Sequence, residues 1–479
     1  MIGGWVIKLS QRLRPSRLWM KLGTEYLPFA DAGSANLPMA RLARLSLFQV
    51  SCGLCSVLLI GTLNRVMIVE LHVPAALVAT MLAIPVLFAP FRALIGFRSD
   101  RYRSALGWRR FPYIWKGQVV MFGGLSIMPF ALILLSGDNT GPAWTGPASA
   151  AIAFLVVGIG LHTVQTAGLA LVTDLTPPEK QPQAVAFLSV MLLLGMFVGS
   201  LAYGAILSPF SQFKLIAAIQ GSALLCMALT TIAMWKQEAR RHGAGDGRLY
   251  PESERFLEAW RALRSQGPWL RRLVVTALGT AGFVMQDILL EPYGGQLLGL
   301  SVSATTLLTS LLAGGGIFGF IVAARRMTEG TDPHRVAGAG AMIGVFAFAF
   351  VLMAAPAQSP LMLAGGAMLI GFGAGLFAHA TLTSCMQAAP PGQGGLALGL
   401  WGAANATAAG AAIGMGGWLR DTLGQLAISG ALGEVLATPL TGYATVYGLE
   451  MLILFATALA VGPLVRTHGF SRAMPSPQP

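Results

Sequence analysis

Residues 286–295 read Gln-Asp-Ile-Leu-Leu-Glu-Pro-Tyr-Gly-Gly, and they lie within an apolar stretch long enough to cross a membrane. Asp287 and Glu291 are four residues apart, so they share one face of a helix. A carboxylate at membrane depth is costly unless it faces protein or water, so we expect this face to line a polar interior between helices. Pro292 and the closing glycine pair weaken the helix, which a membrane tolerates only where the freed backbone groups find partners.

The composition of the whole chain is that of a helical membrane protein. Of its 479 residues, 55% are hydrophobic and 11% are charged, and the mean hydropathy is +0.67. A soluble chain would carry about 25% charged residues. The apolar runs last roughly 20 residues without alternating, which favours helices over a β-barrel. The four cysteines lie in these runs, and we interpret them as small apolar packing residues.

The apolar runs predict twelve membrane-spanning helices. Their predicted limits are 45–71, 75–97, 113–136, 148–173, 183–207, 213–235, 271–298, 301–323, 335–355, 361–386, 394–418 and 442–465. Of the 32 Lys and Arg residues, all but Arg65, Lys214 and Arg420 fall in or beside segments that this topology places on one side. The positive-inside rule makes that side cytoplasmic, with both termini and the central loop. The net charge of +13 therefore indicates topology, and we expect no nucleic-acid partner.

The chain also contains an internal repeat. Gly158-Ile-Gly160 recurs 213 residues later as Gly371-Phe-Gly373, and Gly96-Phe97 recurs 223 residues later as Gly319-Phe320. Similar offsets across a polar loop predict two six-helix halves. The predicted organisation is a basic cytoplasmic segment (1–44), an N-terminal bundle (45–235), a cytoplasmic central loop (236–270), a C-terminal bundle (271–465) and a cytoplasmic tail (466–479).

The loop after the second span reads Gly-Phe-Arg-Ser-Asp-Arg-Tyr-Arg over residues 96–103, followed by Gly-Trp-Arg-Arg over 107–110. It resembles the signature loop of the major facilitator superfamily, an all-α membrane fold of two six-helix halves with a cavity between them. The acid can pair with loop arginines or cap a helix N-terminus. At the equivalent position of the second half, Ala324 replaces the acid, so the motif is complete only in the first half. The motif residues are Gly96, Asp100, Arg101, Arg109 and Arg110.

Few strongly polar side chains lie inside the predicted spans, and we expect several to form an ion network. The first and seventh spans are equivalent elements of the two halves, so Arg65 is predicted to pair with Asp287 or Glu291. Such a pair would be purely structural, or it would act in gating or ligand capture. The predicted network is Asn64, Arg65, Glu70, Arg92, Gln286, Asp287 and Glu291.

Four segments of the chain carry a more specific resemblance: residues 61–71, 88–97, 107–110 and 286–295. They resemble the PucC/LhaA group, the bacteriochlorophyll-delivery branch of the major facilitator superfamily, and the likeness extends over about residues 25–470. The resemblance implies an assembly factor in the inner, intracytoplasmic photosynthetic membrane of a purple bacterium. It would hand bacteriochlorophyll, or a late precursor, to light-harvesting antenna polypeptides. Bacteriochlorophyll synthase and the reaction centre–antenna complex are further implied partners, and we favour a core-antenna member (LhaA) over a peripheral-antenna one (PucC).

Two histidines are candidates for holding such a pigment. His162 and Gln165 lie three residues apart on one helix face, and His379 occupies the repeat position of Thr166. A neutral imidazole can ligate the magnesium of a chlorin, and it can equally donate to a backbone carbonyl; the sequence leaves both open. Water held by Gln165 is a third possibility.

Two other functional classes fit the same sequence. A cation-coupled solute symporter of the sugar type shares the Ser-Asp-Arg loop and would need a coupling acid, for which Asp287 is the candidate. A scaffold without a ligand is the other. We do not expect an enzyme, because the sequence has no metal cluster, nucleophile elbow or phosphate loop.

Overall fold

The computed structural model describes residues 37–87, 95, 108, 110–136, 142, 144–177, 180–238, 261, 263–265, 267–389 and 394–465. Five predicted site residues lie outside these ranges: Arg92, Gly96, Asp100, Arg101 and Arg109. All regular structure in the described part is helical, and ten helical runs there are long and apolar enough to cross a membrane.

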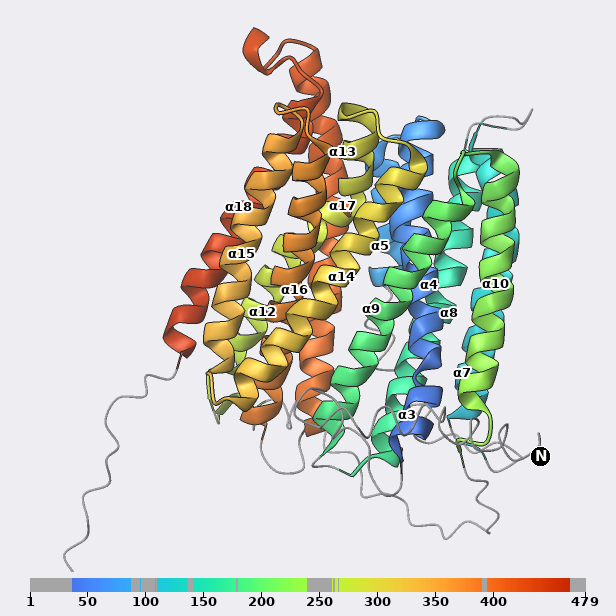
Figure 1. The fold of residues 1–479 in the computed structure, drawn as a ribbon. Coiled ribbons are helices and arrows are strands. Elements are labelled where there is room, and N and C mark those ends of the chain that lie inside the picture. The colour runs from blue at the N-terminus through green and yellow to red at the C-terminus, as the bar shows by residue number, and fades with distance from the viewer. Residues whose placement is uncertain are drawn as a thin grey trace, which may run out of the picture.

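The N-terminal half occupies one side of the molecule (Figure 1). Its first span combines α3, α4 and two π-helical segments, η3 and η4, and is followed by five further helices. The bounds are α3 Met39–Leu45, α4 Leu47–Val57, η3 Leu58–Leu63, η4 Val66–Glu70, α5 Ala75–Leu87, α7 Phe111–Leu135, α8 Thr145–Leu175, α9 Gln181–Ile206 and α10 Gln212–Met234.

The C-terminal half occupies the other side (Figure 1). Its first span is divided into α12, the 3-10 segment η6 and α13. The bounds are α12 Trp269–Val284, η6 Met285–Ile288, α13 Leu290–Leu297, α14 Val302–Thr328, α15 Pro333–Ala354, α16 Pro360–Ala388, α17 Gly394–Ile428, η7 Glu434–Leu436, α18 Leu440–Val461 and η8 Gly462–Leu464. Each predicted span contains a helix in its described residues, and in the second span that helix is described as far as Leu87. Helix α17 continues beyond the predicted end of the eleventh span near residue 418, as far as Ile428.

Polar side chains begin several of these helices. Ser211 accepts a hydrogen bond from the Lys214 amide at 3.2 Å, and Ser301 does the same for Ala304. Asp332 accepts from the His334 amide at 2.7 Å. Each acceptor satisfies a backbone donor that the first turn of a helix leaves free.

Glycines of the internal repeat lie at equivalent contacts in the two halves. A Cβ on Gly160 would lie 2.4 Å from the Met121 nitrogen, so α8 packs closely on α7. A Cβ on Gly373 would lie 2.7 Å from the Gly340 oxygen, so α16 packs on α15 in the same manner. The repeat therefore encodes matched helix contacts, as small residues do in membrane bundles.

The halves meet along two helix pairs, α5 with α17 and α9 with α14. The Ser200 and Ser310 hydroxyls are 2.6 Å apart across the second pair. In the first pair, a Cβ on Gly417 would lie 2.7 Å from the Ala75 oxygen. The first and seventh spans also touch directly, η3 with η6 and η4 with α13, and the predicted ion network lies there.

Close packing within the C-terminal half is testable at Gly371, where a Cβ would lie 1.9 Å from the Leu312 oxygen of α14. We expect Gly371→Val to lower the free energy of unfolding by about 1–3 kcal/mol, because the helices must move apart. Gly365→Val is the control on the same helix, since a Cβ there meets nothing within 4 Å. Thermal unfolding of the purified protein measures both, and equal melting temperatures would contradict the packing argument.

Candidate functional site

The seventh span is broken at the motif with which the sequence analysis began. Regular α-helix ends at Val284, the 3-10 segment covers Met285–Ile288, and α13 starts at Leu290. Pro292 is the third residue of α13, where it has no N–H to donate to the carbonyl four residues earlier. The break therefore precedes the proline. The glycine pair, which was expected to weaken the helix, lies inside α13.

The backbone groups freed by the break find partners on two other spans. The Asn64 side-chain amide donates to the Ile288 carbonyl at 3.0 Å and to the Asp287 carbonyl at 3.3 Å. The Gln286 amide nitrogen donates to Oε1 of Glu450 on α18 at 2.6 Å. Asn64 and Glu450 are both fully buried. The first and twelfth spans thus supply the hydrogen bonds that the broken seventh span lacks.

The first span is also irregular at this level. Asn64 and Arg65 lie between the π-helical segments Leu58–Leu63 and Val66–Glu70. Such segments insert an extra residue per turn, change the direction of nearby side chains and are frequent at functional sites. The sequence analysis missed them, because an apolar run such as Leu58–Leu63 has the same composition in either kind of helix.

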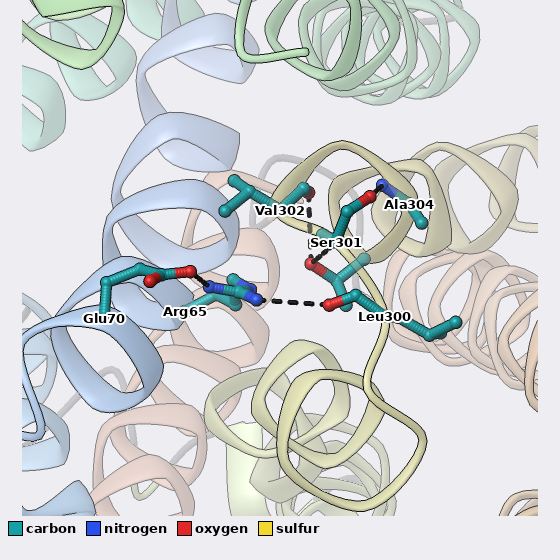
Figure 2. Close-up of polar contacts among 7 residues, drawn as sticks. Arg65, Glu70, Leu300, Ser301, Val302 and Ala304 are labelled. Atoms are coloured by element: carbon teal, nitrogen blue, oxygen red, sulfur yellow. Dashed lines mark hydrogen bonds and ion pairs between the residues drawn. The ribbon is translucent and has the colours of Figure 1, made fainter. Parts of the chain in front are cut away.

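Arg65 pairs with a residue other than the one predicted. Its Nη1 lies 2.5 Å from Oε1 of Glu70, and its Nη2 donates to the Leu300 carbonyl at 3.2 Å (Figure 2). The predicted ion pair with Asp287 or Glu291 is wrong. The π-helical geometry explains this result, since it brings residues five apart, here Arg65 and Glu70, onto one face.

The carboxyl groups of the seventh span are held by neutral donors. Thr309 on α14 donates to Oε1 of Glu291 at 2.5 Å. The Gln286 side-chain amide donates to Asp287. Glu291 is 2% exposed, and its Oε2 has no hydrogen-bond partner among the described residues. The two acids thus lie in the interior as expected, but neither forms an ion pair with the basic residues that the structure describes.

Arg110 is the part of the loop motif that the structure describes, and acids outside the motif hold it. Its Nε lies 3.0 Å from Asp174 at the end of α8. Glu238 accepts from the backbone nitrogens of Arg110 and Phe111, at 3.1 and 2.8 Å, and so caps the start of α7. The sequence analysis missed both acids, although each lies at the end of a predicted span.

The three candidate pigment residues lie on two helices. His162 and Gln165 are half-buried on α8, and the His162 carbonyl accepts from the Thr166 hydroxyl at 2.7 Å. His379 is buried on α16, and its ring lies 5.2 Å from that of Phe320. Nδ1 of His379 has no hydrogen-bond partner within the described part of the chain. Nδ1 of His379 therefore does not donate to a described backbone carbonyl.

A second polar cluster joins the two halves and was not predicted. Arg420 contacts Asp421 and Gln296, each at 2.5 Å, and Tyr443 donates to Gln296 at 2.6 Å. Asp421 also accepts from the Ala76 nitrogen at 2.6 Å, which caps α5 of the opposite half. The sequence did contain a signal, because Arg420 is one of three basic residues outside the predicted cytoplasmic segments.

Comparison with known proteins gives the family. The sequence model of the family described as PUCC protein matches residues 62–469, so the chain belongs to the PucC family. It is 54% identical to "Protein PucC" of Rhodovulum sulfidophilum, over 84% of this chain and 89% of that one. It is 51% identical to an "Uncharacterized protein in puhA-bchM intergenic region" of Rhodobacter capsulatus, over 94% of both. A more distant relative, also from Rhodobacter capsulatus, is named "Bacteriochlorophyll synthase 44.5 kDa chain". The two sequences are 28% identical over 91% of this chain and 98% of the relative.

Solved structures identify the fold. A bacterial homologue of the human lysosomal transporter Spinster, in an inward-facing and unoccupied conformation, superposes with a TM-score of 0.64. The sequence identity is 14%, and the alignment covers 88% of this chain and 95% of that one. The protein is thus an all-α membrane protein with the major facilitator superfamily fold. The prediction of the family and of its fold is confirmed.

The Arg65–Glu70 pair can be tested by a double-mutant cycle. Arg65 is 4% exposed and Glu70 is 36% exposed, so Glu70→Gln leaves a buried cation without its partner. We expect Glu70→Gln to lower the free energy of unfolding by about 1–3 kcal/mol, after allowing for solvent at the carboxylate. Adding Arg65→Gln should recover part of that loss.

The matched control is Asp287→Asn, which we expect to be additive with Arg65→Gln because the two side chains do not pair. Chemical unfolding of the purified protein provides both cycles. The Arg65–Glu70 pair would be contradicted if the losses of unfolding free energy for Arg65→Gln and Glu70→Gln were additive while those for Arg65→Gln and Asp287→Asn were coupled.

Proposed function

We propose that this protein is an assembly factor for bacterial light-harvesting antenna complexes, and that it binds bacteriochlorophyll or a late precursor and passes it to antenna polypeptides within the membrane. Membership of the PucC family supports this proposal, as does the relative named a bacteriochlorophyll synthase chain. The proposed role is not enzymatic. It places the protein in the inner, intracytoplasmic photosynthetic membrane with both termini cytoplasmic, and the partners include the synthase and the core complex.

His379 is the residue that best suits a chlorin in the described part of the chain. A chlorin would bring a magnesium ion, and a neutral imidazole would be able to ligate it. His379 is buried, and its Nδ1 is without a hydrogen bond among the described residues. Phe320 beside it offers an aromatic surface. His162, or water held by Gln165, is the alternative ligand on α8.

A cation-coupled solute symporter is the second candidate. It is supported by Glu291, a buried acid that is not part of an ion pair among the described residues, and by the transporter fold. The absorption spectrum of the purified protein separates the two candidates. A near-infrared pigment band agrees with the first, while a colourless protein that accumulates a solute agrees with the second.

The assembly role is tested by deleting the gene in a phototroph while antenna transcripts are held constant. We expect antenna absorbance to be lost and to return with the parent gene. We expect His379→Ala to restore it poorly if this imidazole is the ligand. His72→Asn is the control, because His72 is exposed and has a φ of 54°, which asparagine accepts.

Normal antenna absorbance in the deletion strain would contradict the assembly role. If the antenna is lost but His162→Ala and His379→Ala both restore it fully, the role is retained and the ligand assignment is wrong.

A further inference from the structure

The first span of one half and the seventh span of the other present matched pairs of a charged residue and a glycine. A Cβ on Gly61 would lie 2.6 Å from Oε1 of Glu291, and a Cβ on Gly295 would lie 3.3 Å from Nη2 of Arg65. Gly61 and Arg65 are four residues apart, as are Glu291 and Gly295. Each glycine therefore leaves space for the charged side chain of the opposite half.

This arrangement places one cation beside two acids. Arg65 pairs with Glu70, which belongs to the same half. Glu291 belongs to the other half and lies one helical turn before Gly295, where a Cβ would lie 3.3 Å from Nη2 of Arg65. A buried carboxylate without a cation is costly, whereas the protonated acid is not. In this conformation Thr309 holds one oxygen of Glu291, and Oε2 is free to carry a proton.

We propose that Glu291 is a proton-binding site that controls the relative position of the two halves, with Arg65 exchanging Glu70 for Glu291 when the proton leaves. In the described conformation Glu291 is a neutral acid. When its O–H bond breaks, the proton passes to water and the carboxylate attracts the guanidinium. The Arg65–Glu70 pair lies within one half and the Arg65–Glu291 pair would join the two halves. Proton loss therefore favours a different arrangement of the halves.

The titratable groups around Glu291 are few. The first span contributes Arg65 and Glu70, the 3-10 segment η6 contributes Asp287, α13 itself contributes Tyr293, and α18 contributes Glu450 beyond the break. On α14 the hydroxyl of Thr309 donates to Glu291, and the buried hydroxyl of Thr306 faces it as well. Among these groups Arg65 is the cation, so its position decides whether the charged form of Glu291 is stabilised. The inference concerns conformation and does not depend on the proposed cargo.

The test is a distance measurement between the two halves as a function of pH. Spin labels are placed by Trp235→Cys and Glu329→Cys, which are 63% and 62% exposed and follow the ends of α10 and α14. The four native cysteines are buried, and the parent protein controls for their labelling. Pulsed electron–electron double resonance is then recorded on the full-length protein in lipid nanodiscs, from about pH 5 to pH 9. It gives the populations of the distances between the two labels.

We expect two distance populations whose ratio changes with pH, with the described conformation favoured at low pH. Glu291→Gln, which is permanently neutral, should keep that conformation throughout the range. Glu70→Gln frees Arg65 for Glu291, so the midpoint pH should fall by about one unit or more. Distances that do not respond to pH in the parent protein would overturn the proposal. So would a Glu291→Gln variant that responds like the parent, or a Glu70→Gln midpoint that is unchanged or higher.

Discussion

The structure depends on the requirement that a membrane-buried backbone satisfy its own hydrogen bonds. The seventh span breaks this rule locally, because Pro292 supplies no donor and the chain adopts a 3-10 turn over Met285–Ile288. Asn64 of the first span and Glu450 of the twelfth supply the missing hydrogen bonds. A lipid-facing break would leave these groups unsatisfied, so the broken segment must lie between the halves. The fold and the polar site are therefore consequences of the same constraint.

The charges near the break follow from its geometry. The π-helical turn that aims Asn64 at the broken segment also brings Arg65 over Glu70, so the guanidinium is neutralised within its own half. Glu291 accepts a hydrogen bond from Thr309 and packs against Gly61 of the first span. An uncompensated acid at membrane depth marks a functional position more often than a structural one. The family relationship identifies the setting, and this acid provides a physical means by which the two halves can respond to a proton.

Much of the architecture could be predicted from the sequence, because length and hydropathy alone define a membrane helix. All twelve predicted spans contain helices, and the repeat at Gly160 and Gly373 corresponds to equivalent contacts. The partner of Arg65 was not predicted, since the predicted pair rested on the equivalence of the first and seventh spans, and the π-helical turn that brings Glu70 beside Arg65 has no signal in the sequence. The role of Glu450 depends on a contact with Gln286, 164 residues away, for which the sequence carries no local signal. The extension of α17 beyond residue 418 was not predicted, because Arg420 and Asp421 interrupt the apolar run there.

The hydrogen bond from the Gln286 amide to Glu450 is the interaction that tests this account most directly. Hydrogen–deuterium exchange of the purified protein, read at Gln286, reports its strength. The account predicts slow exchange in the parent and in Glu450→Gln, whose carboxamide oxygen still accepts. It predicts exchange faster by about tenfold or more in Glu450→Ala, the change expected when a hydrogen bond to a charged or strongly polar group is lost. Glu434→Ala, in the 3-10 segment η7 outside the spans, should leave the rate unchanged. Equal exchange rates in the parent and in Glu450→Ala would contradict the account.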